Sequence, residues 1–203
     1  MKKVRYLGYL FILPAVIAMI LVHVIPMGWG ILISFRDLTL RNIRNWREAP
    51  FTGLKNYITA FNPVTTVGQR FLRSLQNILL YGFVTITVGF LIALGVALLM
   101  NKPFVGRNIV RGIILIPYIT PDSVAYNFWR FIFQSRIGIL NEMLLRIGII
   151  QEPIMWLVGK NTIWAVIIAS IWKGWPLTSL MLLAGLQTIP VELYEAARID
   201  GAN

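Results

Sequence analysis

Residues 74–101 have the sequence SLQNILLYGFVTITVGFLIALGVALLMN, which contains no Asp, Glu, Lys or Arg. A helix needs about 20 residues to cross the hydrocarbon core of a bilayer, which is about 30 Å thick. This stretch is long enough to cross it with some tilt. Apolar and polar residues alternate in the strands of an outer-membrane barrel, but they do not alternate along this stretch. The stretch therefore predicts a transmembrane helix.

Further apolar runs extend the pattern to a polytopic protein. Their ranges are 6–35, 111–134 and 161–186. The run 111–134 begins with Arg111 and is interrupted by Asp122 and Arg130, and the run 161–186 carries Lys173. We expect an all-α membrane protein, a bundle with four transmembrane helices in this chain. The segments that connect or follow these helices are then 36–73, 102–110, 135–160 and 187–203.

The composition supports this class. Of the 203 residues, 57% are apolar and 13% are charged, whereas a soluble domain has about 25% charged residues. The net charge of +11 is typical of a nucleic-acid-binding protein when the chain is soluble. Here the basic residues flank the apolar runs, where they meet anionic lipid head groups, so we expect contact with membrane lipid and no nucleic acid. The absence of cysteine excludes disulfides and thiolate metal sites, and we expect no metal.

The sequence does not decide by charge which side of the membrane holds the termini. Four crossings place both termini and residues 102–110 on one side, and residues 36–73 and 135–160 on the other. The second side carries more Lys and Arg in total, which disfavours cytoplasmic termini. Three of the first five residues are basic, which favours cytoplasmic termini.

Small residues recur at every fourth position of the second predicted helix, at Gly89, Ala93 and Ala97. Such a stripe lets two membrane helices approach closely. We interpret it as a packing surface.

The third predicted helix contains a helix-start pattern within its apolar run. Thr120 suits an N-cap, Pro121 a first helical position, and Asp122 the positive end of a helix dipole. Two interpretations follow. The run consists of two half-helices, as along the pathway of many transporters, or it is one helix with a proline kink and a locally satisfied Asp.

Lys173 lies about a dozen residues into the fourth predicted helix, near the middle of the membrane. An ionised Lys there costs about 2.5–3.5 kcal/mol unless it meets a partner or water, so it should face protein or a cavity. Pairing with Asp122 is one possibility. The neighbouring Trp172 and Trp175 form either a wall for a ligand or part of the bundle core. The candidate residues of a solute path are Asp122, Tyr126, Trp172, Lys173 and Trp175.

Two other functions use the same residues differently. Asp122 and Lys173 are a conceivable acid/base pair of a membrane-embedded enzyme, since buried ionisable groups have perturbed pKa values. No catalytic nucleophile pattern accompanies them. A purely structural membrane subunit is the third interpretation.

The segment after the fourth helix predicts a short interfacial helix. Pro190 suits its first turn, Glu192 and Glu195 suit its N-terminal dipole, and Gly201 suits a C-terminal cap. Its compact patch of two alanines and a carboxylate suits a partner's groove. An ordinary surface helix has the same pattern.

The same segment resembles a known family. Glu195-Ala196-Ala197, followed by Gly201, is similar to the EAA loop of the membrane subunits of binding-protein-dependent ABC importers, and residues 194–203 (YEAARIDGAN) resemble its carbohydrate-importer form. Other stretches resemble the maltose and glycerol-3-phosphate type permeases, especially the first of their two permease subunits. These are Phe11-Ile12-Leu13-Pro14, Ser34-Phe35, Gly53-Leu54-Lys55-Asn56-Tyr57, Ile116-Pro117, Gly138-Ile139-Leu140-Asn141 and Ala184-Gly185-Leu186-Gln187 before Ile189-Pro190.

The resemblance implies a fold of about six core helices, a second permease subunit, two cytoplasmic ATPase subunits and an extracytoplasmic solute-binding protein. ATP and Mg would be bound by the ATPase subunits, and this chain would have no cofactor. The residues that would couple it to the ATPase are Glu195, Ala196, Ala197, Asp200 and Gly201.

The resemblance also implies a place and a mechanism. The chain would be a multi-pass protein of a bacterial or archaeal cytoplasmic membrane with a cytoplasmic N-terminus, and it would import a sugar or related solute by alternating access. Residues 36–73 and 135–160 would be extracytoplasmic, and residues 102–110 and 187–203 cytoplasmic. Because the sequence ends at Asn203, within the loop motif, we expect an N-terminal fragment or a truncated product.

Overall fold

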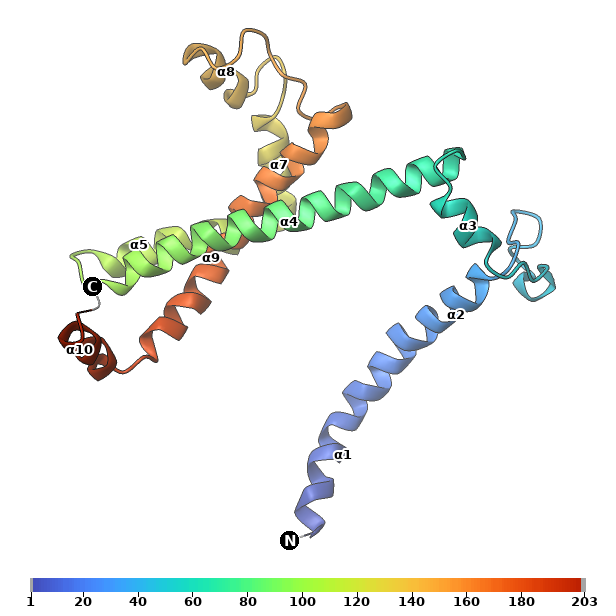
Figure 1. Ribbon diagram of the computed structural model, residues 1–203, viewed down its shortest axis with the longest axis horizontal. Coiled ribbons are helices and arrows are strands. Elements are labelled where there is room, and N and C mark those ends of the chain that lie inside the picture. The colour runs from blue at the N-terminus through green and yellow to red at the C-terminus, as the bar shows by residue number, and fades with distance from the viewer. Residues whose placement is uncertain (1, 202–203) are drawn as a thin grey trace. The chain divides into compact units, whose positions relative to one another are not determined.

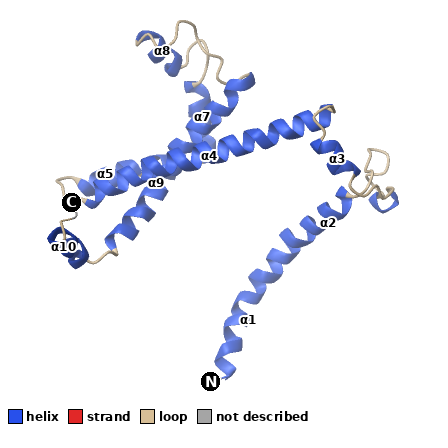
Figure 2. Ribbon diagram, viewed as in Figure 1, coloured by secondary structure: helices blue, strands red, loops and turns tan. Residues whose placement is uncertain are grey.

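The structure is a computed structural model that describes residues 2–201. These residues form helices and connecting segments without a β-strand, apart from one isolated antiparallel bridge between Arg36 and Phe51. Figure 2 shows the helical content along the chain. The chain divides into two compact units, Met1–Leu75 and Gln76–Asn203. Of the predicted segments, Met1, Ala202 and Asn203 lie outside the described residues.

The first unit begins with one long helical rod made of α1 (Lys2–Met19), η1 (Ile20–Val24) and α2 (Ile25–Ser34). The middle piece is π-helical because the Ile25 N–H donates to the carbonyl oxygen of Ile20, five residues back. Pro26 follows at once and has no N–H to donate. Such single-turn bulges accommodate a proline without ending the helix. The predicted span 6–35 is therefore helical up to Ser34, with a local irregularity before Pro26.

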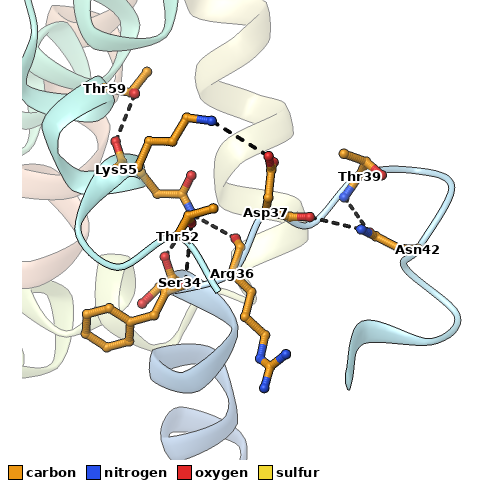
Figure 3. A network of polar contacts seen from close by, with 10 residues as sticks. Ser34, Arg36, Asp37, Thr39, Asn42, Thr52, Lys55 and Thr59 are labelled. Atoms are coloured by element: carbon orange, nitrogen blue, oxygen red, sulfur yellow. Dashed lines mark hydrogen bonds and ion pairs between the residues drawn. The ribbon is translucent and has the colours of Figure 1, made fainter. Parts of the chain in front are cut away.

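The segment after α2 is more ordered than a simple loop. It contains η2 (Trp46–Glu48) and α3 (Lys55–Phe61). The Asn56 Nδ2 donates to the carbonyl oxygens of Ser34, at 2.8 Å, and Arg36, at 2.9 Å. The Ser34 hydroxyl lies 2.6 Å from the Tyr57 hydroxyl. These contacts tie α3 to the end of α2, and Figure 3 shows the polar contacts around Ser34 and Arg36.

Helix α4 (Thr66–Asn101) begins eight residues before the apolar run that predicts it. Thr65 caps it, because the Thr65 hydroxyl oxygen accepts the Gly68 N–H at 2.9 Å. Gly68 is required there, since a Cβ atom would clash with the carbonyl group of Asn62. The helix also contains Arg70 and Arg73, which limit an apolar run but favour helix formation as much as other long side chains do.

In the second unit, the C-terminal part of α4 packs against α5 (Arg107–Ile114) and α9 (Thr162–Gln187), as Figure 1 shows. The core there consists of Ala97, Met100 and Leu183, with Val110 and Ile114 packed on it. The predicted packing stripe is confirmed: Gly89 is buried, and Ala93 and Ala97 are fully buried. Small side chains let the helix backbones approach.

The predicted third span is wrong as a single helix. Residues 111–134 are divided among α5, α6 (Ile116–Ile119) and α7 (Asp122–Ile132). The interruption at Leu115 is slight and precedes Pro117, which has no N–H. The interruption at Thr120 and Pro121 is complete, because both residues are extended, with ψ of 126° and 141°. The half-helix interpretation is therefore the correct one, with Pro121 rather than Thr120 as the N-cap.

The connection between α7 and α9 is held by a buried asparagine. It contains α8 (Ile139–Arg146) and η3 (Gly159–Asn161). The Asn141 amide donates to the carbonyl oxygens of Ser135 and Ile154 and accepts the indole N–H of Trp156, at 2.8 Å. The Asn141 side chain is 2% exposed. The segment 135–156 thus has a defined conformation, since buried amide groups need their partners.

Within the described chain, three helical stretches are long and apolar enough to cross a membrane: Leu7–Ser34, Thr66–Asn101 and Gly159–Gln187. The third predicted crossing, residues 111–134, corresponds to the broken helices α5 to α7 and is not among these three stretches, so it stays a prediction. The final helix, α10 (Val191–Ile199), is short. The predicted class, an all-α membrane protein, is confirmed.

Candidate functional site

The candidate site lies where α6 ends and α7 begins, against α9. The extended Thr120 and Pro121 interrupt the hydrogen-bond ladder, so carbonyl groups at the end of α6 lack helical partners. The end of α6 also carries the negative pole of its dipole, and the start of α7 the positive pole. A break of this kind leaves backbone carbonyl and N–H groups without helical partners inside a membrane region. Polar groups must therefore lie nearby to bond them.

Lys173 of α9 supplies that partner. Its Nζ donates to the carbonyl oxygen of Thr120 at 2.6 Å and, in a longer contact of 3.5 Å, to that of Tyr118. The same Nζ lies 2.9 Å from the Asp122 Oδ1. The predicted Lys173 and Asp122 pair is present, and the cation also bonds the break itself. The ammonium group therefore donates hydrogen bonds to carbonyl groups that the helix break leaves free, and these carbonyl groups stabilise the ammonium charge.

The two members of this pair differ in their surroundings. The Lys173 side chain is 18% exposed, whereas the Asp122 side chain is 74% exposed. Tyr126 lies one helical turn beyond Asp122 on the same face of α7 and is 45% exposed. The lysine is thus a half-buried tether, and the carboxylate and the phenol form an open polar face of α7.

An aromatic row borders this face. Trp172 of α9 meets Trp129 of α7 edge to face with ring centroids 5.7 Å apart, and Trp129 stacks on Phe133 at 5.2 Å. Phe133 continues the row to Trp156 at 5.8 Å. The Trp129 Nε1 is buried and has no hydrogen-bond partner within residues 2–201. Trp129 was not predicted from the sequence; its only signal was its place one turn before Phe133 on the same helix.

Trp175 lies apart from this row. It lines a hollow of about 270 Å³ between α4 and α9, together with Thr85, Gly89, Phe90, Ser170 and Gly174. The interpretation of Trp172 and Trp175 as a wall for a ligand stays a prediction. Residues three apart differ by about 60° in direction around a helix, and here Trp172 meets Trp129 of α7 whereas Trp175 lines the hollow beside α4.

The chemistry of the site is that of binding and positioning. Among the residues described, no group of three or more His, Asp or Glu side chains gathers closely enough to hold a metal ion. The site offers one carboxylate, one phenol, one half-buried ammonium and the faces of several indoles. These groups suit hydrogen bonding and stacking of a polar, ring-shaped solute.

The second candidate element is α10 with its C-terminal end. All its side chains are exposed except that of Ala197, which is half-buried. Glu195, Ala196 and Ala197 lie within the helix, and Asp200 follows it, its N–H donating to the carbonyl oxygen of Ala196 at 3.0 Å. Gly201 has φ of +83°, a left-handed conformation that favours glycine. The predicted glycine cap is confirmed.

The span α9 links the two elements directly. Lys173 and the C-terminal end of α9 at Gln187 are separated by about 21 Å of continuous helix, at 1.5 Å per residue. Four residues later α10 begins. One helix and a short connection therefore join α10 to the break between α6 and α7.

Comparison with known families gives one clear match. The family described as "Binding-protein-dependent transport system inner membrane component" matches residues 85–203. This range is more than half of the chain, and it includes α6, α7, α9 and α10.

Individual relatives and solved structures agree with this match. The chain is 34% identical over its whole length to a trehalose/maltose transport system permease protein of Thermococcus litoralis, covering 66% of that protein. It is 36% identical over 98% of its length to a sulfoquinovosyl glycerol transport system permease protein of Agrobacterium fabrum, covering 62%. A bacterial ABC transporter that imports the acidic polysaccharide alginate has a similar fold, with a TM-score of 0.74 at 24% identity over 99% of this chain and 64% of that one. The chain thus spans slightly less than two thirds of these proteins.

Proposed function

This chain belongs to the family of inner-membrane components of binding-protein-dependent transport systems, and from this premise we propose that it forms part of a permease subunit of an ATP-driven importer. The solute is a sugar or a related polar compound, since curated relatives are named as permeases for trehalose, maltose and sulfoquinovosyl glycerol. Transport occurs by alternating access, and the chain makes or breaks no bond in the solute.

The observation that carries this proposal is the exposed helix α10. It follows a membrane-spanning helix, contains Glu195-Ala196-Ala197 and ends at the left-handed Gly201. A short amphipathic helix that the rest of the unit leaves uncovered is suited to a groove on a partner. We assign that partner as the ATPase subunit, whose movements α10 transmits to α9.

The break between α6 and α7 is the proposed solute-facing element. Asp122 and Tyr126 offer hydrogen-bond partners to hydroxyl groups, and Trp172 and Trp129 offer apolar faces for a sugar ring. Lys173 keeps the broken helix in place. Trp175, in its separate hollow beside α4, has the more distant role of shaping the helix packing.

The assembly has further parts. We assign to it a second permease subunit, two ATPase subunits that bind ATP and Mg, and an extracytoplasmic binding protein. A solved alginate transporter of similar fold was obtained in complex with a periplasmic protein carrying an alginate pentasaccharide, which supports the last of these. The cytoplasmic membrane of a bacterium or archaeon, with the N-terminus on the cytoplasmic side, is the location that fits these partners.

The curated relatives are transport permease proteins, so the enzyme interpretation of Asp122 and Lys173 is set aside. Water access to α7 distinguishes the two remaining interpretations: a permease has a solute path that water enters along α7, and a purely structural subunit does not. In the complete protein, Tyr126→Cys is expected to react with a membrane-impermeant thiol reagent, and added solute should slow the reaction several-fold.

Phe128→Cys is the matched control, because residue 128 lies on nearly the opposite face of the same helix and is also exposed in the chain, at 58%. We expect this variant to stay unreactive against lipid or the second subunit. Residues 1–203 contribute no native cysteine to the background reaction. Equal reactivity of the two variants, without protection by solute, would refute the solute path.

A further inference from the structure

Residues 39–48, which we call the basic tip, carry apolar and cationic side chains that the rest of the first unit leaves uncovered. Leu40 is 93% exposed and Ile43 is 54% exposed. Arg41, Arg44 and Arg47 are also exposed. Two large aliphatic side chains beside three arginines have the combination of apolar and cationic groups that suits the boundary between lipid tails and head groups.

The basic tip has a fixed conformation. The Asn42 Oδ1 accepts the Thr39 N–H at 2.6 Å, and the Asn42 Nδ2 donates to the carbonyl oxygen of Asp37 at 3.0 Å, as Figure 3 shows. At the other end, the Arg36 Nη1 donates to the carbonyl oxygens of Arg47 and Ala49, both at 2.8 Å. These bonds close the segment into a compact turn, so Leu40 and Ile43 are presented outward by a defined backbone.

The tip folds back along the membrane-spanning helix. The Trp46 ring lies 4.8 Å from that of Trp29, which is five residues before the end of α2 at Ser34. Trp29 lies about 7.5 Å before the end of this helix along its axis, so Trp46 packs beside the last turns of α2. The guanidinium groups of Arg36 and Arg47 lie 5.8 Å and 5.5 Å from the Trp46 ring. Tryptophan with flanking arginine is typical of the boundary between hydrocarbon and head groups.

The charge of the tip matches an anionic surface. Residues 36–48 contain four arginines and two carboxylates. The Asp37 carboxylate lies 3.7 Å from the Lys55 Nζ, and the Glu48 carboxylate accepts from the Asn45 amide at 3.2 Å. Both acidic groups already have partners. A hollow of about 310 Å³, lined by Arg44, Asn45, Trp46, Arg47 and Glu48, lies within the tip.

We propose that the basic tip is a membrane-surface anchor that binds the phosphodiester groups of acidic phospholipids. Leu40 and Ile43 enter the head-group region, and Arg41, Arg44 and Arg47 bind phosphate oxygens, for which the planar guanidinium group is suited. The anchor fixes the end of α2 relative to the bilayer. This role explains why a predicted loop on the outer side is strongly basic.

The depth of the tip favours lipid over a protein partner. Trp46 is beside a helix whose side chains from residue 7 to residue 32 are all exposed in this chain, as for a helix in lipid. The candidate span Leu7–Ser34 is longer than the hydrocarbon core requires, so its last turns, beside which Trp46 lies, are at the level of the head groups when this helix crosses the bilayer. The extracytoplasmic binding protein is therefore the alternative that the experiment must separate.

The test places a nitroxide label on Leu40→Cys in the otherwise cysteine-free chain. The labelled chain is reconstituted in phosphatidylcholine vesicles with and without phosphatidylglycerol. We expect phosphatidylglycerol to raise the oxygen accessibility of the label and lower its nickel-complex accessibility. Each arginine should contribute about fivefold to the inserted population, so replacing Arg41, Arg44 and Arg47 by Gln removes the response. Concentrated salt should also weaken it.

Val64→Cys is the matched control, because Val64 is likewise an exposed aliphatic residue of the first unit, at 84%, but lies outside the tip. Its label should not respond to phosphatidylglycerol. Ile43→Cys provides a second reporter within the tip. The proposal is overturned if the labels at 40 and 43 remain equally accessible to the nickel complex in both lipids, or if only added binding protein shields them.

Discussion

Replacing Gly201 by Val in the complete protein is expected to reduce solute uptake by at least about tenfold while the importer still assembles. Gly201 has φ of +83° with open space around its Cα, so the cost of the substitution is conformational rather than steric. A left-handed conformation costs an ordinary residue about 1–2 kcal/mol, and β-branched valine is among the least tolerant. The chain should therefore leave α10 in another direction and misplace the proposed coupling surface. Uptake and ATPase activity are measured on the same reconstituted importer.

Gly201→Asn separates this explanation from general damage. Asparagine adopts the left-handed conformation more readily than other non-glycine residues, so it should retain most of the uptake. Membrane content and co-purification of the partners should be the same for both variants. If Val and Asn reduce uptake equally, or if Val has no effect, the backbone of Gly201 is not what transmits coupling.

Replacing Lys173 by Met is expected to cause the second large loss. Methionine fills a similar volume but cannot donate to the carbonyl oxygen of Thr120, which Lys173 contacts at 2.6 Å. Hydrogen bonds that involve a charged group contribute about 1.5–3 kcal/mol, equivalent to roughly 10- to 100-fold in the population of the intact break. Uptake should fall by a comparable factor, with the protein still present in the membrane.

Asp122→Asn serves as the matched variant for this prediction. The Asp122 side chain is 74% exposed, and exposed ion pairs contribute little. It should therefore lower uptake of an uncharged sugar only a few-fold, because the bond between Lys173 and Thr120 survives. If Asp122→Asn is as damaging as Lys173→Met, the ion pair or a direct solute contact dominates, and the carbonyl bond does not.

The sequence predicted the spanning helices because the bilayer imposes a simple requirement. Runs of about 20 apolar residues have one stable form, a helix that satisfies its own backbone. It predicted their ends less well. Helix α4 begins at Thr66 rather than Ser74, since charge limits an apolar run but does not end a helix. The cap that begins it, Thr65, is a local signal that hydropathy does not include.

The broken helix was partly predictable. Thr120-Pro121-Asp122 indicated a new helix start, and α7 does begin at Asp122. The sequence also suggested the pair between Asp122 and Lys173. It did not suggest that Lys173 would bond the Thr120 carbonyl, because every residue has a carbonyl group and only the approach of α6 to α9 selects this one.

The largest gap concerns the segment between α2 and α4. Its basic residues were visible, but their arrangement around Trp46 was not. That arrangement depends on contacts between residues far apart in sequence, such as Trp29 with Trp46 and Asn56 with Ser34. Short helices such as η2 and α3 have weak intrinsic stability and depend on such contacts.

Photo-cross-linking from α10 tests the central claim most directly. Tyr194, which is 44% exposed, is replaced by p-benzoylphenylalanine in the complete protein, expressed with its partners in native membranes and irradiated. The account predicts an adduct with the cytoplasmic ATPase subunit that depends on the probe being at this position. An adduct with the extracytoplasmic binding protein, or none with the ATPase in an assembled importer, would contradict it.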